Sequence, residues 1–101
     1  MIEAAETALS FVAGRDRADL DSDQMLFFAL VRAIEIVGEA ASQVSLATRQ
    51  ATSNVPWSVI VGMRNRVVHG YADINHDIVW QTATEALPEL LPTLRSLVAT
   101  P

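Results

Sequence analysis

The sequence predicts an all-α protein, an antiparallel up-and-down helical bundle of four main helices that forms a homodimer. Two observations predict the helices: apolar residues recur three and four positions apart over four stretches, and no stretch shows the alternation typical of a strand. A third predicts the dimer. Half of the 101 residues are hydrophobic and the mean hydropathy is +0.26, a surplus that so small a core does not usually bury alone.

The composition limits the possible classes of function. The chain, residues 1–101, has the length of a single domain. Its formal charge is −5, whereas a general nucleic-acid binder is usually basic. All seven basic residues are arginines, so any contact with RNA must come from a local arginine cluster.

Several kinds of site and location are not expected. The absence of cysteine excludes disulfides and thiolate metal ligands. His69 and His76 do not form a standard ligand pair, so we expect no metal and no other cofactor. No run approaches the roughly 20 apolar residues of a membrane span, and the N-terminus is acidic where a signal peptide is basic. We therefore expect a cytoplasmic protein.

The first two helices are predicted at residues 2–12 and 22–45, joined by a charged connector over 14–21 without periodicity. Asp21, Ser22 and Asp23 offer an N-cap for the second helix. This helix is apolar nearly all round, so we expect one side to face the chain's own core and another to face a second subunit.

Polar residues still form a stripe on the helix at 22–45. Arg32, Glu35 and Glu39 follow one another at helical spacing. Either they form a solvated face with an Arg32–Glu35 ion pair, or Arg32 and Glu39 line a cleft at the dimer interface. Gly38 interrupts the same helix at a cost of about 1 kcal/mol relative to alanine. Close approach of a neighbouring backbone would explain that cost.

The third and fourth helices are predicted at residues 56–69 and 76–98. Pro56 suits the first turn of the third helix, and Gly70 is placed to cap its C-terminus. Asn75 is a good N-cap for the fourth. Two prolines inside the last apolar pattern predict a kink or break near 85–91.

The segment between Gly62 and Tyr71 gathers most of the groups that can bind an anion or move a proton. On a helix, Asn65 and His69 differ by about 40° and Arg66 lies about 60° from His69. Arg64 lies about 140° away, so it meets His69 only if the helix ends first or if two subunits build the site.

These side chains suit RNA cleavage. An imidazole can take the proton of a 2′-hydroxyl, and an arginine can stabilise the charge that grows on the phosphate. Plainer interpretations exist for each residue. His69 can be a capping or core residue, Arg64 and Arg66 can complement the helix dipole, and Tyr71 can be a packed aromatic.

The segment resembles the HepT family of HEPN-domain proteins, whose motif is arginine, four residues, histidine, any residue and tyrosine. Here this is Arg64-Asn65-Arg66-Val67-Val68-His69-Gly70-Tyr71. The resemblance covers roughly residues 20–95. It includes Ile34-Glu35-Ile36-Val37-Gly38-Glu39-Ala40-Ala41, Val55-Pro56-Trp57, Ile60-Val61-Gly62-Met63, Asp77-Ile78-Val79-Trp80 and Leu87-Pro88.

The resemblance implies a HEPN-like homodimer acting as a metal-independent ribonuclease toxin of a toxin–antitoxin pair. Its partner would be an MNT-type nucleotidyltransferase antitoxin, which can attach AMP to Tyr71. Arg64 would bind the scissile phosphate, His69 would transfer protons and Asn65 would support either. A substrate-binding role for Arg66 and Arg32 is our own hypothesis.

Two alternatives remain open. The dimer could be a non-catalytic binding partner and AMPylation target of the nucleotidyltransferase. It could also be a structural helical dimer with no site, in which replacing Arg64 or His69 changes only stability.

Overall fold

The computed structural model describes residues 1–68 and 75–99, with side chains except at 66–68 and 98–99. This described part is helical and contains no strand. The elements are α1 (Ile2–Val12), α2 (Asp19–Ser22), α3 (Gln24–Ser42), α4 (Leu46–Ala51), α5 (Trp57–Val68), α6 (His76–Gln81), the π-helical segment η1 (Thr82–Ala86) and α7 (Leu87–Ala99). The all-α prediction is confirmed for these residues.

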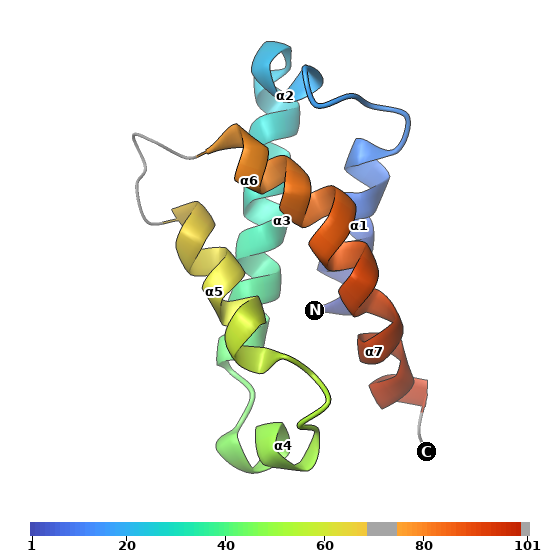
Figure 1. Ribbon diagram of the computed structural model, residues 1–101, viewed down its shortest axis with the longest axis vertical. Coiled ribbons are helices and arrows are strands. Elements are labelled where there is room, and N and C mark those ends of the chain that lie inside the picture. Colours follow the sequence, from blue (N-terminus) through green and yellow to red (C-terminus); the bar gives the residue numbers. More distant parts are fainter. Residues whose placement is uncertain (69–74, 100–101) are drawn as a thin grey trace.

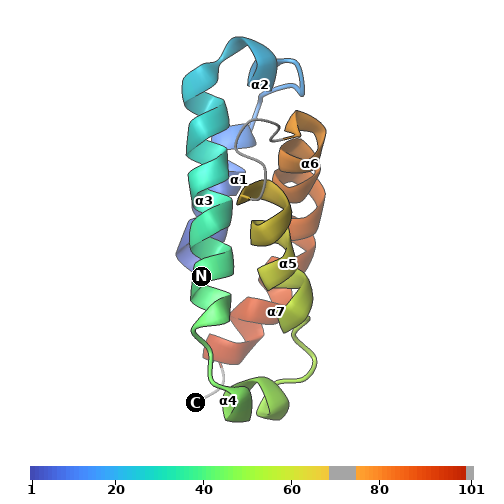
Figure 2. The same cartoon turned by 90° about the vertical axis from the view of Figure 1, so that its left-hand side faces the viewer.

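The helix α3 occupies the centre of the molecule. Helix α1 packs on one side of it and α5 on another, while α7 packs against α1. The chain runs along the long axis in alternating directions through α1, α3, α5 and the α6–α7 stretch (Figure 1). Seen from the side in Figure 2, the body is narrow, and its principal extents are 43 × 28 × 16 Å.

The core forms where these helices meet. Its members are mostly aliphatic side chains from α1, α2, α3, α5 and the C-terminal helices, and the largest of these lose essentially all contact with solvent. Burying each such side chain stabilises the fold by roughly 1.5–3 kcal/mol. The largest fully buried side chains are Leu20, Leu30, Ile34, Val37, Ile60, Val79, Leu87 and Leu91.

The predicted connector at 14–21 is not wholly irregular, because α2 begins in it and ends one residue beyond it. Leu20 is 1% exposed and gives this single turn an apolar anchor. Arg15 then holds both ends of the turn, through Asp19 at 3.3 Å and Asp23 at 2.8 Å. One buried leucine and short-range ion pairs are too local to produce a periodic pattern, so the sequence does not reveal this helix.

The central helix is shorter than the predicted 22–45. Its N-cap is Asp23, whose side chain accepts a hydrogen bond from the Leu26 backbone N–H at 3.1 Å. The helix ends at Ser42. Ser45, predicted to be its last residue, instead caps α4 by accepting from the Thr48 N–H at 3.2 Å.

The C-terminal stretch contains the irregularity that its prolines predict, but the helix does not break. Helix α6 continues through the π-helical η1 into α7. Pro88 has no N–H for the carbonyl of Thr84, and its ring crowds that carbonyl. The wider π-helical turns over Thr82–Ala86 give room for it and overlap the predicted 85–91 window only at its start. Pro92 is accommodated inside α7.

None of the helices in the described part of the chain combines the length and apolarity that crossing a membrane requires.

Candidate functional site

Helix α5 carries the arginine of the motif against α3. Ile60 is 0% exposed, and Arg64 follows one turn later on the same face of the helix. Gly38 lies opposite on α3. A Cβ atom placed on Gly38 would overlap the Arg64 Cβ and would lie 3.0 Å from its Cγ and 3.2 Å from its Cδ. A close neighbour at Gly38 is therefore confirmed, but the nearest atoms belong to the Arg64 side chain and not, as predicted, to a backbone.

The guanidinium of Arg64 has an unusual environment. Its Nε is buried and has no hydrogen-bond partner in the described part of the chain. An unsatisfied buried donor costs about 1–3 kcal/mol, and more when it belongs to a charged group. An anionic acceptor such as a phosphate oxygen would remove this cost, because it would give the donor a charge-assisted hydrogen bond.

The other motif residues are described only in part. Asn65 is exposed beside Arg64 on α5. The backbone of Arg66 belongs to the same helix, and its side chain is outside the described set. His69 and Tyr71 fall in the 69–74 range that the structure does not describe, together with the predicted cap at Gly70. The predicted pairing of Asn65 with His69 therefore stays a prediction.

Arg32 lies on α3 and is held by acidic neighbours on the same helix. Its Nη1 is 3.3 Å from Glu35 and 3.7 Å from Glu39, and the side chain is 61% exposed. This geometry matches the interpretation of a solvated face with an Arg32–Glu35 pair. A role for Arg32 in substrate binding stays a prediction.

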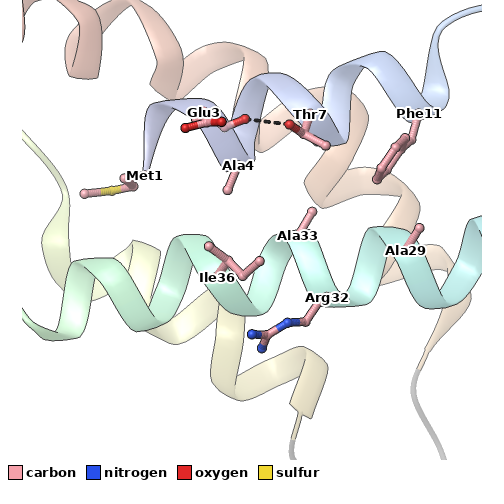
Figure 3. A pocket seen from close by; sticks show the side chains of 9 residues that line it. All are labelled: Met1, Glu3, Ala4, Thr7, Phe11, Ala29, Arg32, Ala33 and Ile36. Carbon is pink, nitrogen blue, oxygen red and sulfur yellow. Dashed lines mark hydrogen bonds between the residues drawn. The ribbon is translucent and has the colours of Figure 1, made fainter.

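A shallow groove runs between α1 and α3, with Arg32 at its edge (Figure 3). It encloses about 510 Å³. Its apolar lining includes Phe11, Ala29 and Ile36, and two further apolar side chains on α3 are turned to solvent, Met25 at 83% and Phe28 at 58% exposure. The sequence signal for this surface was the excess of apolar residues on the central helix.

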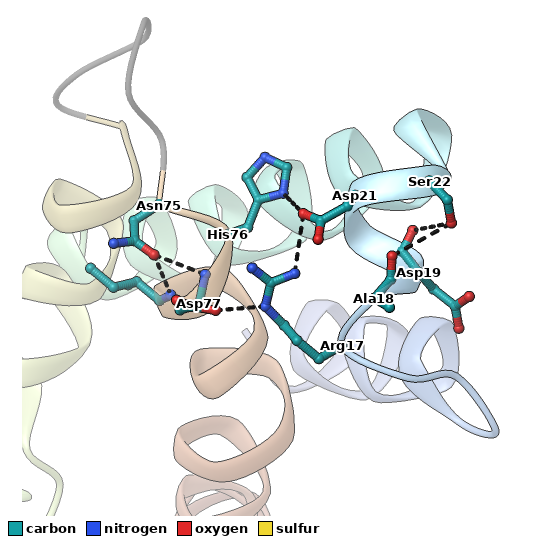
Figure 4. Close-up of polar contacts among 9 residues, drawn as sticks. Arg17, Ala18, Asp19, Asp21, Ser22, Asn75, His76 and Asp77 are labelled. Carbon is teal, nitrogen blue, oxygen red and sulfur yellow. Dashed lines mark hydrogen bonds and ion pairs between the residues drawn. The ribbon is translucent and has the colours of Figure 1, made fainter.

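A polar network holds the start of α6 (Figure 4). His76 Nδ1 lies 2.8 Å from Asp21, and Arg17 bonds Asp77 through Nε at 2.7 Å and Asp21 through Nη1 at 3.2 Å. The His76 ring stacks on Phe27 with centroids 4.1 Å apart. The hydrogen bond from the Arg17 guanidinium is the main cause that lowers the pKa of the Asp21 carboxyl, and the hydrogen bond with His76 lowers it further. No sequence pattern reveals this network, because the contacts of residues 17 and 21 with residues 77 and 76 span 60 and 55 positions of the chain.

This network and a local cap fix the point where the described chain resumes after residue 74. Asn75 accepts hydrogen bonds from the backbone N–H groups of Asp77 at 2.8 Å and Ile78 at 3.2 Å. The N-cap predicted at Asn75 is confirmed, and α6 starts at His76 as predicted. Helix α5 thus packs against α3, and α6 packs against both α2 and α3.

A family model described as "Ribonuclease HepT-like" matches residues 1–97. The chain belongs to this family. Its resemblance at the motif is therefore part of a relationship that extends over nearly the whole chain. No solved structure matches it.

Several named proteins are similar to this chain. A protein of Caldanaerobacter subterraneus subsp. tengcongensis named "Putative RNase" is 33% identical, over 97% of this chain and 88% of its own length. One from Methanocaldococcus jannaschii with the same description is 31% identical, over 89% of this chain and 83% of its own length. A "Probable ribonuclease HepT" of Thermococcus cleftensis is 30% identical, over 87% of this chain and 80% of its own length. The family and these names support a ribonuclease-like function.

Proposed function

We propose that this protein is an endoribonuclease toxin of a toxin–antitoxin system. It cleaves RNA without a metal ion, in a cleft formed by the Arg64-x4-His69-x-Tyr71 motifs of two subunits. The observation that carries the proposal is the buried, unpartnered Nε of Arg64, within the described part of a chain whose family is that of HepT-like ribonucleases. A cation with an unused donor is what a phosphodiester requires.

The chemistry needs no group beyond the motif and the RNA. His69 takes the proton of a 2′-hydroxyl, whose oxygen then attacks the adjacent phosphorus. Arg64 stabilises the charge on the pentacovalent phosphate, and Asn65 orients a phosphate oxygen or the imidazole. The P–O5′ bond breaks, and the 5′-oxygen leaves with the proton that the His69 imidazolium returns to it. The products are a 2′,3′-cyclic phosphate and a 5′-hydroxyl.

Two further arginines would hold the RNA on either side of the scissile bond. Arg66 follows Arg64 by two residues on α5. Arg32 would have to share its guanidinium between a phosphate and the carboxylates of Glu35 and Glu39. Since those two acids reduce the local positive potential, we expect Arg32 to contribute less to RNA affinity than Arg66 does.

The proposal includes a second subunit. The helices would form a HEPN-like up-and-down bundle that pairs as a homodimer, bringing His69 of one motif towards Arg64 of the other. Apolar residues left on the surface support this part of the proposal. Met25, Phe28 and Ile36 are 83%, 58% and 38% exposed along α3, beside the apolar groove against α1.

Neutralisation would come from a nucleotidyltransferase antitoxin of the MNT type in the cytoplasm. It would transfer AMP to the hydroxyl of Tyr71 and block the cleft with a bulky anion. The net charge of −5 would suit a basic partner. The chemistry is an attack of the phenol oxygen on the α-phosphorus of ATP, with pyrophosphate as the leaving group.

RNA cleavage in the presence of EDTA tests the enzymatic half. The wild-type protein should produce cyclic-phosphate ends, His69→Ala should produce none, and Arg64→Ala should produce them far more slowly. Arg95→Ala is a matched control, since Arg95 is exposed and pairs only with Glu6 in the described part of the chain. Cleavage that persists in His69→Ala would come from another nuclease and would contradict the assignment.

Intact mass spectrometry tests the antitoxin half. Incubation with the nucleotidyltransferase and ATP should add AMP to the wild type and leave Tyr71→Phe unmodified. AMP addition to a protein that cleaves no RNA would favour the alternative, a non-catalytic dimer that serves as the partner and target of that enzyme.

A further inference from the structure

We propose that Gly38 is the positioning residue of Arg64: the missing side chain on α3 sets the path of the arginine towards the phosphate. This inference rests on the proposed function and extends it to a residue outside the motif. Gly38 has no side chain with which to act on RNA, so its part in cleavage lies only in the position it gives to Arg64.

The backbone of Gly38 does not explain the glycine. Among the described residues, the glycine with a positive φ is Gly14, whereas Gly38 lies in regular helical geometry inside α3. Alanine would stabilise that helix, because glycine is the poorer helix former. The residue is therefore not there for its conformational freedom.

Space explains it instead. A Cβ on Gly38 would overlap the Arg64 Cβ and press on Cγ and Cδ at 3.0 and 3.2 Å. The first of these contacts is with an atom directly attached to the backbone of α5, so no rotation of the arginine relieves it. Any side chain at position 38 must move α5 away from α3 or twist it.

This packing has a consequence for the guanidinium. The aliphatic part of Arg64 lies over Gly38, and Nε is buried behind it without a partner in the described part of the chain. When packing holds the aliphatic part of an arginine side chain, its guanidinium has fewer orientations to lose on binding a phosphate. Moving that aliphatic part displaces the charge from the place where the transition state needs it.

The chain provides a matched control for the experiment. Gly62 is also a helical glycine, it lies on α5 two residues before Arg64, and a Cβ placed there meets nothing within 4 Å. Gly38→Ala and Gly62→Ala thus make the same chemical change in neighbouring helices. We expect Gly38→Ala to lower kcat for RNA cleavage about 100-fold, as a displacement of about 1 Å can do, and Gly62→Ala to keep the wild-type rate.

Two double variants separate positioning from general damage. If Gly38 acts through Arg64, the Gly38→Ala, Arg64→Ala protein should be no slower than Arg64→Ala alone, whereas independent defects would multiply. In an Arg64→Gly background the colliding Cβ is absent. Gly38→Ala should then raise the melting temperature, although it lowers that temperature when Arg64 is present.

The outcomes distinguish this inference from the function on which it rests. Equal cleavage rates for Gly38→Ala and Gly62→Ala would overturn the inference about Gly38. The proposed ribonuclease function would still stand if the wild type cleaves RNA. A wild type that cleaves no RNA would overturn both as statements about catalysis. An effect of Gly38→Ala on the melting temperature that is the same in the wild-type and Arg64→Gly backgrounds would refute the contact itself, whatever the activity.

Discussion

Ile60 is fully buried on the motif-bearing helix α5, which packs against α3, so replacing it tests the packing under the candidate site. The side chain is 0% exposed and lies one turn before Arg64. Ile60→Ala removes three carbon atoms, worth about 2.4 kcal/mol by transfer from water at about 0.8 kcal/mol each. The remaining cavity adds to this, and we expect a loss of about 3–4 kcal/mol in unfolding free energy.

The neighbouring residue supplies the control. Val59 is 55% exposed on the same helix, and Val59→Ala should change the unfolding free energy by no more than about 0.5 kcal/mol. Ile60→Val, which removes a single carbon, should cost about 0.5–1.5 kcal/mol. For a domain of this size the Ile60→Ala loss corresponds to a fall in Tm of roughly 15–25 °C.

Urea unfolding followed by far-ultraviolet circular dichroism measures these differences. All variants must be compared at one protein concentration, because dimerisation would make the apparent stability depend on concentration. If Ile60→Ala and Val59→Ala unfold at the same urea concentration, α5 is not packed on α3 through Ile60. The reasoning that places Arg64 over Gly38 would fail with it.

Three further predictions address a cap, an ion pair and the surface of α3. Asn75→Ala removes the acceptor for two N–H groups and should cost about 1 kcal/mol in unfolding free energy, whereas Asn75→Asp should cost less, as denaturant unfolding can show. The guanidinium of Arg15, with the Leu26 N–H, lowers the pKa of Asp23 from its ordinary value of 3.8. The ionised carboxylate therefore stabilises the fold above pH 3.8. This contribution is lost as the pH falls through the lower pKa of the folded state. Acid titration of Tm should therefore show a smaller decline in Arg15→Gln, and an unchanged decline would contradict the pairing. Met25→Glu should turn the proposed dimer into a monomer in sedimentation velocity experiments while Leu46→Glu, at another exposed apolar position, should not; a dimer that survives Met25→Glu would exclude this part of α3 from the interface.

The helices were predictable because their signals are local. Apolar periodicity located each long helix to within a few residues, and Asn75 marked the start of α6 through a cap that needs only its own neighbours. Helix α2 was missed because its stability comes from one buried leucine and from Arg15, which reaches as far as Asp23. Those contacts follow from the fold and have no period in the sequence.

The candidate site divides in the same way. The identity of its residues was readable, because the motif from Arg64 to Tyr71 is continuous in sequence. The cost of a helical glycine also pointed to a close neighbour at position 38. Which side chain fills that space depends on the register of α5 against α3, and the chain between the two helices carries no signal for that register.

Helix α3 connects the two halves of the proposal. Gly38 fixes Arg64 on one side of it, while Met25, Phe28 and Ile36 leave another side apolar and exposed. If a second subunit covers that exposed side, the same rigid helix sets both the place of the arginine in its own chain and its distance from the other motif. On one ideal helix Arg64 lies about 140° from His69, so a single motif does not bring both side chains to one phosphate. The site therefore needs a second motif held at a fixed distance from the first. The glycine and the apolar stripe would then serve one requirement, a fixed separation between two motifs.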